Sequence, residues 1–172
     1  MDASRADVGA RLRAGETLAL DDLEPFASDA DVFGSKTLGL VWDGLALDRV
    51  TAHLDCDERH HQPYGIVHGG VWCAVVESVA SLGAGLRAVA AGGVVVGVSN
   101  STDFLRPHRT GRVDAVAEPI HVGRTQQLWQ VVLTRAADGK VVARGQVRLQ
   151  QLPADRELAG RAPGTPSDRD PA

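Results

Sequence analysis

The longest apolar segment of this chain follows a pair of glycines, Gly69-Gly70, and extends over about twenty residues. So few of its positions are polar that a helix formed here would be buried on nearly all sides. Its apolar positions are Val71, Ala74, Val75, Val76, Val79, Ala80, Leu82, Leu86 and Val89. We expect this helix to end near Ala91, where Gly92-Gly93 follows. A helix of this kind needs other elements packed around it, so the rest of the chain must supply that cover.

Glu77 places a carboxylate two turns into this segment, which is otherwise interrupted only by Ser78, Ser81 and Arg87. An isolated carboxylate is costly to remove from water, so it must be paired, protonated or used in chemistry. A structural ion pair, to Arg87 or to a loop residue, is the alternative to a catalytic role. Glu77 is therefore the first candidate for a functional residue.

The segments on both sides of the helix show the alternation that is typical of β-strands. Before the helix, Leu38–Trp42 and Val50–Leu54 alternate in opposite phase, which predicts a hairpin turn or a bulge near Asp48. Four candidate strands follow the helix: Val94–Leu105, Arg112–His121, Thr125–Arg135 and Lys140–Gln150. The order β-β-α-β-β-β-β predicts an α+β domain, in which an antiparallel sheet of about six strands wraps one long central helix.

The two ends of the chain differ from this central region. Residues 1–37 predict an N-terminal helical segment, interrupted at Gly15 and Pro25. Residues 38–152 form the predicted sheet-and-helix domain. Residues 153–172 lose apolar periodicity, and we expect this tail to be disordered.

Composition limits the kinds of partner. The chain has 172 residues and is 44% hydrophobic, which fits one soluble domain, and its formal net charge of -4 argues against nucleic acid. No apolar run is expected to span a membrane once glycines and charges are counted, and the N-terminus lacks the apolar core of a secretory signal. The two cysteines, Cys56 and Cys73, could form at most one disulfide, so free thiols in the cytoplasm are the expectation.

One constellation of residues is similar to a known family. It consists of Gln62-Pro63, Gly65, His68-Gly69-Gly70 and Glu77 on the predicted order of elements. Supporting fragments are Asn100, Phe104-Leu105, Pro107, Gly111, Gly123-Arg124, Trp129 and Asp138-Gly139-Lys140. Between about Leu38 and Gln150, the chain resembles the hotdog-fold acyl-CoA thioesterases of the phenylacetic-acid-degradation and 4-hydroxybenzoyl-CoA thioesterase group.

The resemblance implies a thioesterase that hydrolyses an acyl-CoA with an aromatic or medium-chain acyl group, without a metal or redox cofactor. It maps the catalytic carboxylate onto Glu77, as nucleophile or general base. Gln62 and Gly69 would lie around the thioester carbonyl, Ser81 would face the same site, and His68 matches the motif histidine. It also implies a homodimer with shared active sites that assembles as a homotetramer.

Helix geometry supports a shared site. Gly69 and Gly70 lack a Cβ, so backbone N–H groups at the helix start could approach a carbonyl oxygen. Glu77 lies eight residues after Gly69, about 12 Å along the helix axis, so one chain cannot bring both to the same carbonyl. A second chain must therefore contribute, and the resemblance implies that Gln62, His68 and Gly69 of one subunit face Glu77 and Ser81 of another.

Several of these residues have simpler interpretations. His68 could only orient the turn, and Ser81 could only hydrogen-bond back to the carbonyl of Glu77. Four cations, Arg106, His108, Arg109 and Arg124, are candidates for binding the phosphates of coenzyme A, with ordinary solvated charge as the alternative. A further cluster contains His53, Cys56, Asp57, His60 and His61. For this cluster, solvated histidines on a surface loop are favoured over a metal site.

Two other functions remain open at this stage. A non-catalytic hotdog protein could bind acyl-CoA as a sensor or carrier, but a binder does not need an ionisable group inside an apolar helix. An enoyl-CoA hydratase on the same fold would need an acid-base pair of Asp and His, and His68 has no suitably placed Asp.

Overall fold

A computed structural model describes residues 3–23 and 32–153. The disordered tail predicted for residues 153–172 and the helix break predicted at Pro25 fall almost entirely outside these ranges, since only Pro153 lies within them.

The central helix, α3, extends over Gly69–Ala90, close to the predicted bounds. His68 caps its start, and Ala91 caps its end just before Gly92, whose φ of 77° favours glycine. Its buried residues are Trp72, Val75, Val76, Val79, Ala80, Gly83, Ala84, Leu86 and Ala88. The predicted helix is confirmed, but in the single chain it is not buried on nearly all sides, because Val71, Ala74 and Leu82 are only partly buried.

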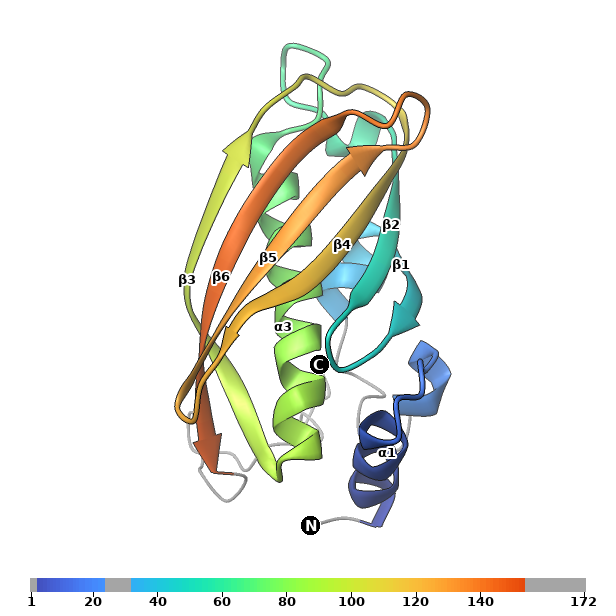
Figure 1. Ribbon diagram of the computed structural model, residues 1–172. Coiled ribbons are helices and arrows are strands. Elements are labelled where there is room, and N and C mark those ends of the chain that lie inside the picture. The colour runs from blue at the N-terminus through green and yellow to red at the C-terminus, as the bar shows by residue number, and fades with distance from the viewer. Residues whose placement is uncertain (1–2, 24–31, 154–172) are drawn as a thin grey trace, which may run out of the picture.

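Six antiparallel strands form one sheet, in the order β1-β2-β4-β5-β6-β3. Their bounds are Leu40–Leu45 for β1, Val50–Cys56 for β2, Gly93–Phe104 for β3, Gly111–Val122 for β4, Gln126–Arg135 for β5 and Val141–Pro153 for β6. The sheet curves around α3, as Figure 1 shows. This is the predicted hotdog architecture, and the α+β fold class is confirmed.

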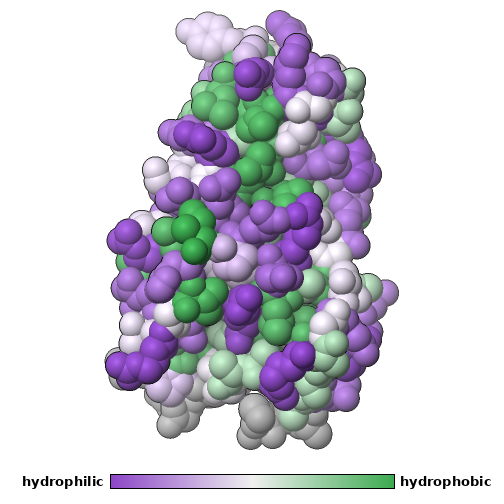
Figure 2. Space-filling model, viewed as in Figure 1, coloured by the Kyte–Doolittle hydropathy of each residue, from purple (hydrophilic) through white to green (hydrophobic). Residues whose placement is uncertain are grey.

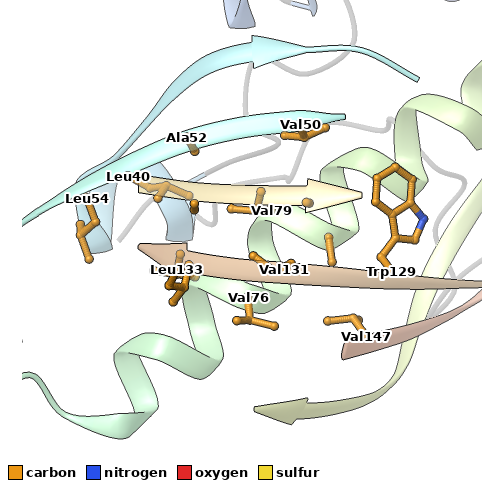
Figure 3. Close-up of a cluster of buried hydrophobic side chains, with 14 of the residues drawn as sticks. Leu40, Val50, Ala52, Leu54, Val76, Val79, Trp129, Val131, Leu133 and Val147 are labelled. Atoms are coloured by element: carbon orange, nitrogen blue, oxygen red, sulfur yellow. The ribbon is translucent and has the colours of Figure 1, made fainter. Parts of the chain in front are cut away.

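The core lies between the inner face of the sheet and α3. Trp129, Val131 and Leu133 alternate along β5 and point inward, where they meet Val76 and Val79 of α3 (Figure 3). All three are 0% exposed, so truncating Leu133 to alanine would cost about 2–5 kcal/mol of stability. Residues between them point to the outer face, which mixes hydrophilic side chains with separate apolar patches (Figure 2).

The phase change predicted near Asp48 has two causes. The turn between β1 and β2 closes with a hydrogen bond from Ala46 N to Arg49 O of 2.9 Å, and the register also shifts within β1, between Trp42 and Gly44. Because of this bulge, Leu40 and Leu45 are both buried although they are five residues apart.

The two edges of the sheet differ. At the β1 edge, Leu18 forms an isolated bridge with Leu45. At the other edge, β3 is a twelve-residue strand whose outer side pairs with nothing in residues 3–23 and 32–153, and its Val98 is 55% exposed. A long apolar edge of this kind is a template for pairing with another strand.

The N-terminal segment packs on the same core. Helix α1 (Ala3–Arg13) contacts α3 through the buried Val8 and Leu12, and the Arg13 guanidinium donates a hydrogen bond to Ala90 O at the end of α3. Three short turns complete the described chain: η1 (Leu20–Leu23), the π-helical turn η2 (Val32–Leu38) and η3 (Glu58–His60).

By length and composition alone, α3 could also cross a membrane, because its mean hydropathy reaches 1.4. The central helix of a soluble protein passes the same test, and α3 is the helix around which the sheet wraps (Figure 1).

Candidate functional site

Glu77 lies between α3 and the edge strand β3. Its carboxylate is half-buried and accepts two hydrogen bonds, from Ser81 Oγ to Oε1 at 3.1 Å and from Asn100 Nδ2 to Oε2 at 2.9 Å. A Cβ on Gly97 would lie 2.8 Å from Oε1, so the glycine leaves the space that the carboxylate occupies. The alternative ion pair with Arg87 is not formed.

Ser81 was expected either to face the active site or to hydrogen-bond back to the carbonyl of Glu77, and the structure shows a third arrangement. Its hydroxyl donates to the side chain of Glu77 and not to the backbone carbonyl of that residue. Because residues four apart lie on one helix face, Ser81 faces the site as predicted, but through the carboxylate.

Asn100 is a site residue that sequence reasoning noted only as a fragment of the family resemblance. Its Nδ2 also donates to Cys73 O at 3.0 Å, and its Oδ1 accepts from Thr102 Oγ1 at 2.7 Å. An asparagine in a strand rich in valine is a weak signal in itself, because asparagine is depleted in strands.

The start of α3 is closed by His68. Its Nδ1 accepts a hydrogen bond from Gly70 N at 2.8 Å, so the Gly70 N–H is already in use. Within the described chain, the Gly69 N–H has no partner, and a Cβ on Gly69 would lie 2.6 Å from the Phe104 ring. The pair of glycines therefore offers one free N–H, from Gly69, at the positive end of the helix dipole.

Gln62 and Gly69 are brought together by the turn before the helix. Gln62 N donates to Ile66 O at 2.8 Å, and Gly65, with a φ of 70°, donates to Gln62 O at 2.9 Å. Gln62, Gly69 and Phe104 line a pocket of about 240 Å³. Glu77 is not among its lining residues. The candidate site thus has two separate halves in one chain, with Gln62, His68 and Gly69 in one and Glu77 and Ser81 in the other.

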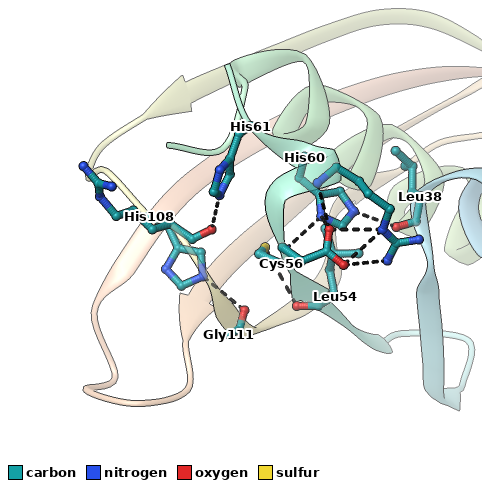
Figure 4. Close-up of polar contacts among 10 residues, drawn as sticks. Leu38, Leu54, Cys56, His60, His61, His108 and Gly111 are labelled. Carbon is teal, nitrogen blue, oxygen red and sulfur yellow. Dashed lines mark hydrogen bonds and ion pairs between the residues drawn. The ribbon is translucent and has the colours of Figure 1, made fainter. Parts of the chain in front are cut away.

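The four predicted phosphate ligands do not converge. Arg106 donates to Val141 O at 2.6 Å, and His108 is 5% exposed, with Nε2 against Gly111 O at 3.1 Å (Figure 4). Arg109 lines a second pocket, of about 370 Å³, and its guanidinium has no partner in the parts of the chain that the structure covers. Arg124, in the turn between β4 and β5, lies at the opposite end of the sheet.

The residues of the candidate metal cluster have separate partners. His60 Nδ1 accepts from Asp57 N at 3.1 Å and its Nε2 donates to Leu38 O at 3.0 Å, while His61 Nε2 meets Arg109 O at 2.7 Å (Figure 4). His53 pairs with Asp43 at 2.9 Å, and burial raises the pKa of the Cys56 thiol to about 12. No three of the described His, Cys, Asp or Glu side chains are grouped to hold a metal ion.

Asp57 shows what this loop does instead. Hydrogen bonds from the Arg59 side chain lower the pKa of Asp57 to about 2, and its carboxylate caps η3 by accepting from Arg59 N. Together with the His60 contact to Leu38, these bonds connect η3 to the end of η2. The cluster therefore orders the loop that leads to Gln62 (Figure 4).

Comparisons with known proteins agree with this fold. The family model described as the thioesterase superfamily matches residues 64–142. Rv1847 of Mycobacterium tuberculosis is 51% identical over 119 residues, which are 68% of this chain and 84% of that protein. The proofreading thioesterase EntH of Cronobacter sakazakii is 38% identical over 96 residues, covering 56% of this chain and 69% of EntH.

Solved structures are similar as well. The crystal structure of thioesterase HI1161 from Haemophilus influenzae has a TM-score of 0.68 at 32% identity, over 80% of this chain and 93% of that one. The phenylacetic acid degradation protein PaaI of Thermus thermophilus, as a variant, has a TM-score of 0.62 at 27% identity, over 69% of this chain and 97% of that one. With the sheet-wrapped helix and the identity to Rv1847, these matches show that the chain belongs to the thioesterase superfamily, as a thioesterase of the hotdog fold.

Proposed function

We propose that this protein hydrolyses an acyl-CoA, with an aromatic or medium-chain acyl group, to the free acid and coenzyme A. The observation that carries the proposal is the state of Glu77. Its carboxylate is half-buried, and both oxygens accept hydrogen bonds from neutral donors, without a cationic partner among residues 3–23 and 32–153. Neutral donors stabilise the anion but leave it able to accept a proton or to attack a carbonyl carbon.

Two routes fit this carboxylate. As a general base, Glu77 takes a proton from water while the hydroxide adds to the thioester carbon, and coenzyme A leaves as the thiol after the tetrahedral intermediate collapses. As a nucleophile, Glu77 attacks that carbon, and water then hydrolyses the resulting acid anhydride. In both routes negative charge builds on the carbonyl oxygen, where the free N–H of Gly69 and the helix dipole would stabilise it.

A second copy of the chain would complete the site. Gly69 and Glu77 lie on one straight helix, about 12 Å apart along its axis, so neither route can use both from one subunit. We propose that β3 pairs with β3 of a partner in antiparallel orientation, around a twofold axis. Support comes from the unpaired outer side of β3 and from the exposed Val98 and Phe104. Such pairing would bring the start of one α3 toward Glu77 of the other.

The nucleotide end of the substrate would lie beside Arg109. The pocket at Gln62 and Gly69 and the pocket at Arg109 share Ile66, Pro107 and His108 in their walls, so they are neighbours. The two other arginines that line the Arg109 pocket already form ion pairs, Arg112 with Asp114 and Arg135 with Asp138. An unpaired guanidinium next to the candidate carbonyl site suits a phosphate. Arg124 could join only from the partner subunit, because antiparallel pairing places opposite ends of the two sheets together.

The larger assembly and the location are further proposals. The resemblance to the thioesterase group supports a homotetramer made of two such dimers, which sedimentation would measure. Cys56 and Cys73 are both free, which supports a reducing compartment such as the cytoplasm. We propose no nucleic-acid or membrane partner.

Free-thiol release from a panel of acyl-CoA substrates tests this function, with Glu77→Gln as the matched variant. We expect turnover by the natural protein and a fall in kcat on the order of 10³ or more for Glu77→Gln, because the amide is nearly isosteric but is neither base nor nucleophile. Tight binding of acyl-CoA without thiol release would indicate a non-catalytic binding protein. Full turnover by well-folded Glu77→Gln would remove the proposed role of Glu77.

A further inference from the structure

We propose that Asn100 is the positioning residue of this site, holding the Glu77 carboxylate in one orientation, with Thr102 supporting the Asn100 amide by a hydrogen bond to its Oδ1. This inference rests on the proposed function, because it assigns the partner that the catalytic carboxylate needs. Asn100 is exposed in the single chain, and it would not itself touch the thioester.

The hydrogen bonds of Asn100 leave its amide only one orientation. Cys73 O can only accept, so the amide atom that contacts it must be Nδ2, and Oδ1 is left to accept from the Thr102 hydroxyl at 2.7 Å. The Nδ2 group then faces α3 and donates one hydrogen to Cys73 O, at 3.0 Å, and the other to Glu77 Oε2, at 2.9 Å. All polar hydrogens of the amide are therefore used.

The carboxylate is thereby fixed from three sides. Asn100 holds Oε2, Ser81 holds Oε1 at 3.1 Å, and Gly97 provides the space beside Oε1. Ser81 is on the same helix as Glu77 and would follow any shift of that helix. Asn100, in contrast, is on β3, so its hydrogen bond holds the carboxylate in place relative to the strand that would join the two subunits.

The position of Asn100 on β3 argues against an incidental contact. Asn100 and Thr102 are two residues apart, so both point to the α3 face of the strand, whereas Ser101 points to the outer face, where it lines a pocket with Gln130 and Gln146. Asparagine is unfavourable in a strand, so its presence opposite a carboxylate calls for a reason other than strand stability.

The charge around Glu77 is simple enough for a pH profile to be informative. In residues 3–23 and 32–153, no charged side chain is in ion-pair contact with Glu77. Its neighbours on β3 are Asn100 and Gly97, and its own helix adds Ser81. In the proposed dimer, His68 of the facing subunit would also lie near this carboxylate. Because His68 is unchanged in every variant below, shifts between variants report on the carboxylate.

The experiment is the pH dependence of kcat/KM for Asn100→Ala, Asn100→Asp, Thr102→Val and Thr102→Ser, each beside the natural protein. Removing a donor makes the anion harder to form, so the loss of activity toward low pH should begin at a higher pH. We expect Asn100→Ala to lower kcat about tenfold to a hundredfold and to move this acid limb to higher pH. Asn100→Asp should move it further, because it puts a second carboxylate beside the first.

The two Thr102 variants test whether the threonine hydroxyl supports the Asn100 amide. Valine has the shape of threonine without the hydroxyl, so Thr102→Val should shift the acid limb in the same direction but less than Asn100→Ala. Thr102→Ser keeps the donor and should recover most of what Thr102→Val loses. Ser101→Ala, on the opposite face of β3, controls for disturbance of the edge strand and should leave the profile unchanged.

A merely structural role gives a different result. If Asn100 only supports the fold, its variants lose activity at all pH values while the acid limb stays where it is in the natural protein, and this outcome would overturn the inference. The folded fraction is measured by circular dichroism at each pH and the activity is expressed per folded protein, so acid unfolding cannot hide or imitate a shift of the limb. If Glu77→Gln is inactive and the acid limb of the Asn100 variants coincides with that of the natural protein, only the inference about Asn100 fails. If Glu77→Gln is fully active, the proposed function fails, and the inference with it.

Discussion

Nδ1 of His68 accepts a hydrogen bond from the backbone N–H of Gly70, 2.8 Å away, across the first turn of α3. The ring must therefore carry its proton on Nε2, since Nδ1 offers a lone pair. This contact selects Gly69 as the N–H that remains for a substrate oxygen. It also gives the motif histidine a definite role at the helix start, which is one of the two roles that the sequence left open.

The cap can be tested by exchange of His68. We expect His68→Ala to lose about 1 kcal/mol of stability, the usual size of a side-chain cap, and His68→Asn to retain most of it, because asparagine is a good N-cap. Urea unfolding of the two variants measures this difference. If both variants are equally stable, the His68 side chain does not cap α3 in solution.

The space beside the carboxylate gives a second prediction. A Cβ on Gly97 would lie 2.8 Å from Glu77 Oε1, so Gly97→Ala should displace the carboxylate and lower kcat by about tenfold or more, through loss of orientation. Gly85→Ala is the matched control, because a Cβ there meets no atom within 4 Å. Steady-state kinetics of both variants, at equal thermal stability, would separate the effects, and equal kcat values would contradict the prediction.

The phosphate assignment predicts an effect on binding alone. Arg109→Ala should raise KM for acyl-CoA and leave kcat nearly unchanged, as the loss of uniform binding energy does. Arg106→Ala should have a smaller effect, because Arg106 already donates to Val141 O. Truncated N-acetylcysteamine thioesters lack the nucleotide, so their KM should not respond to either variant. A KM that is equal for full and truncated thioesters in the natural protein would mean that the nucleotide is not held.

The sequence predicted most of the fold because the signals are local. The apolar run, the glycines around it and the period-two alternation located α3 and all six strands to within about three residues, consistent with the strength of such patterns. The turn η2 lies almost wholly in the predicted N-terminal helical segment, but it includes Leu38, which was predicted to begin the first strand and is held instead by a distant contact between Leu38 O and His60.

The site was predicted less completely because its contacts are tertiary. Glu77 followed from the chain itself and Gln62 from the family resemblance, but the hydrogen bond between Glu77 and Asn100 joins residues 23 positions apart, and it depends on how β3 packs against α3. Likewise, Arg124 appears near Arg109 in the sequence, yet the length of β4 separates them. Distances of this kind require the topology of the sheet.

The shared active site is the central claim, and mixed dimers test it most directly. Gln62→Ala damages one half of the site and Glu77→Ala the other, so each variant alone should be crippled or inactive. In a mixed dimer, twofold symmetry gives one site both lesions and the other site neither.

The measurement is the thioesterase activity of the two variants after they are unfolded and refolded together in equal amounts. About half the dimers should be mixed, with one intact site in each, so about a quarter of the natural activity should return. The comparison is with each variant refolded alone in the same way, since Gln62→Ala could retain partial activity. A mixture no more active than the average of the two separate variants would contradict the shared site.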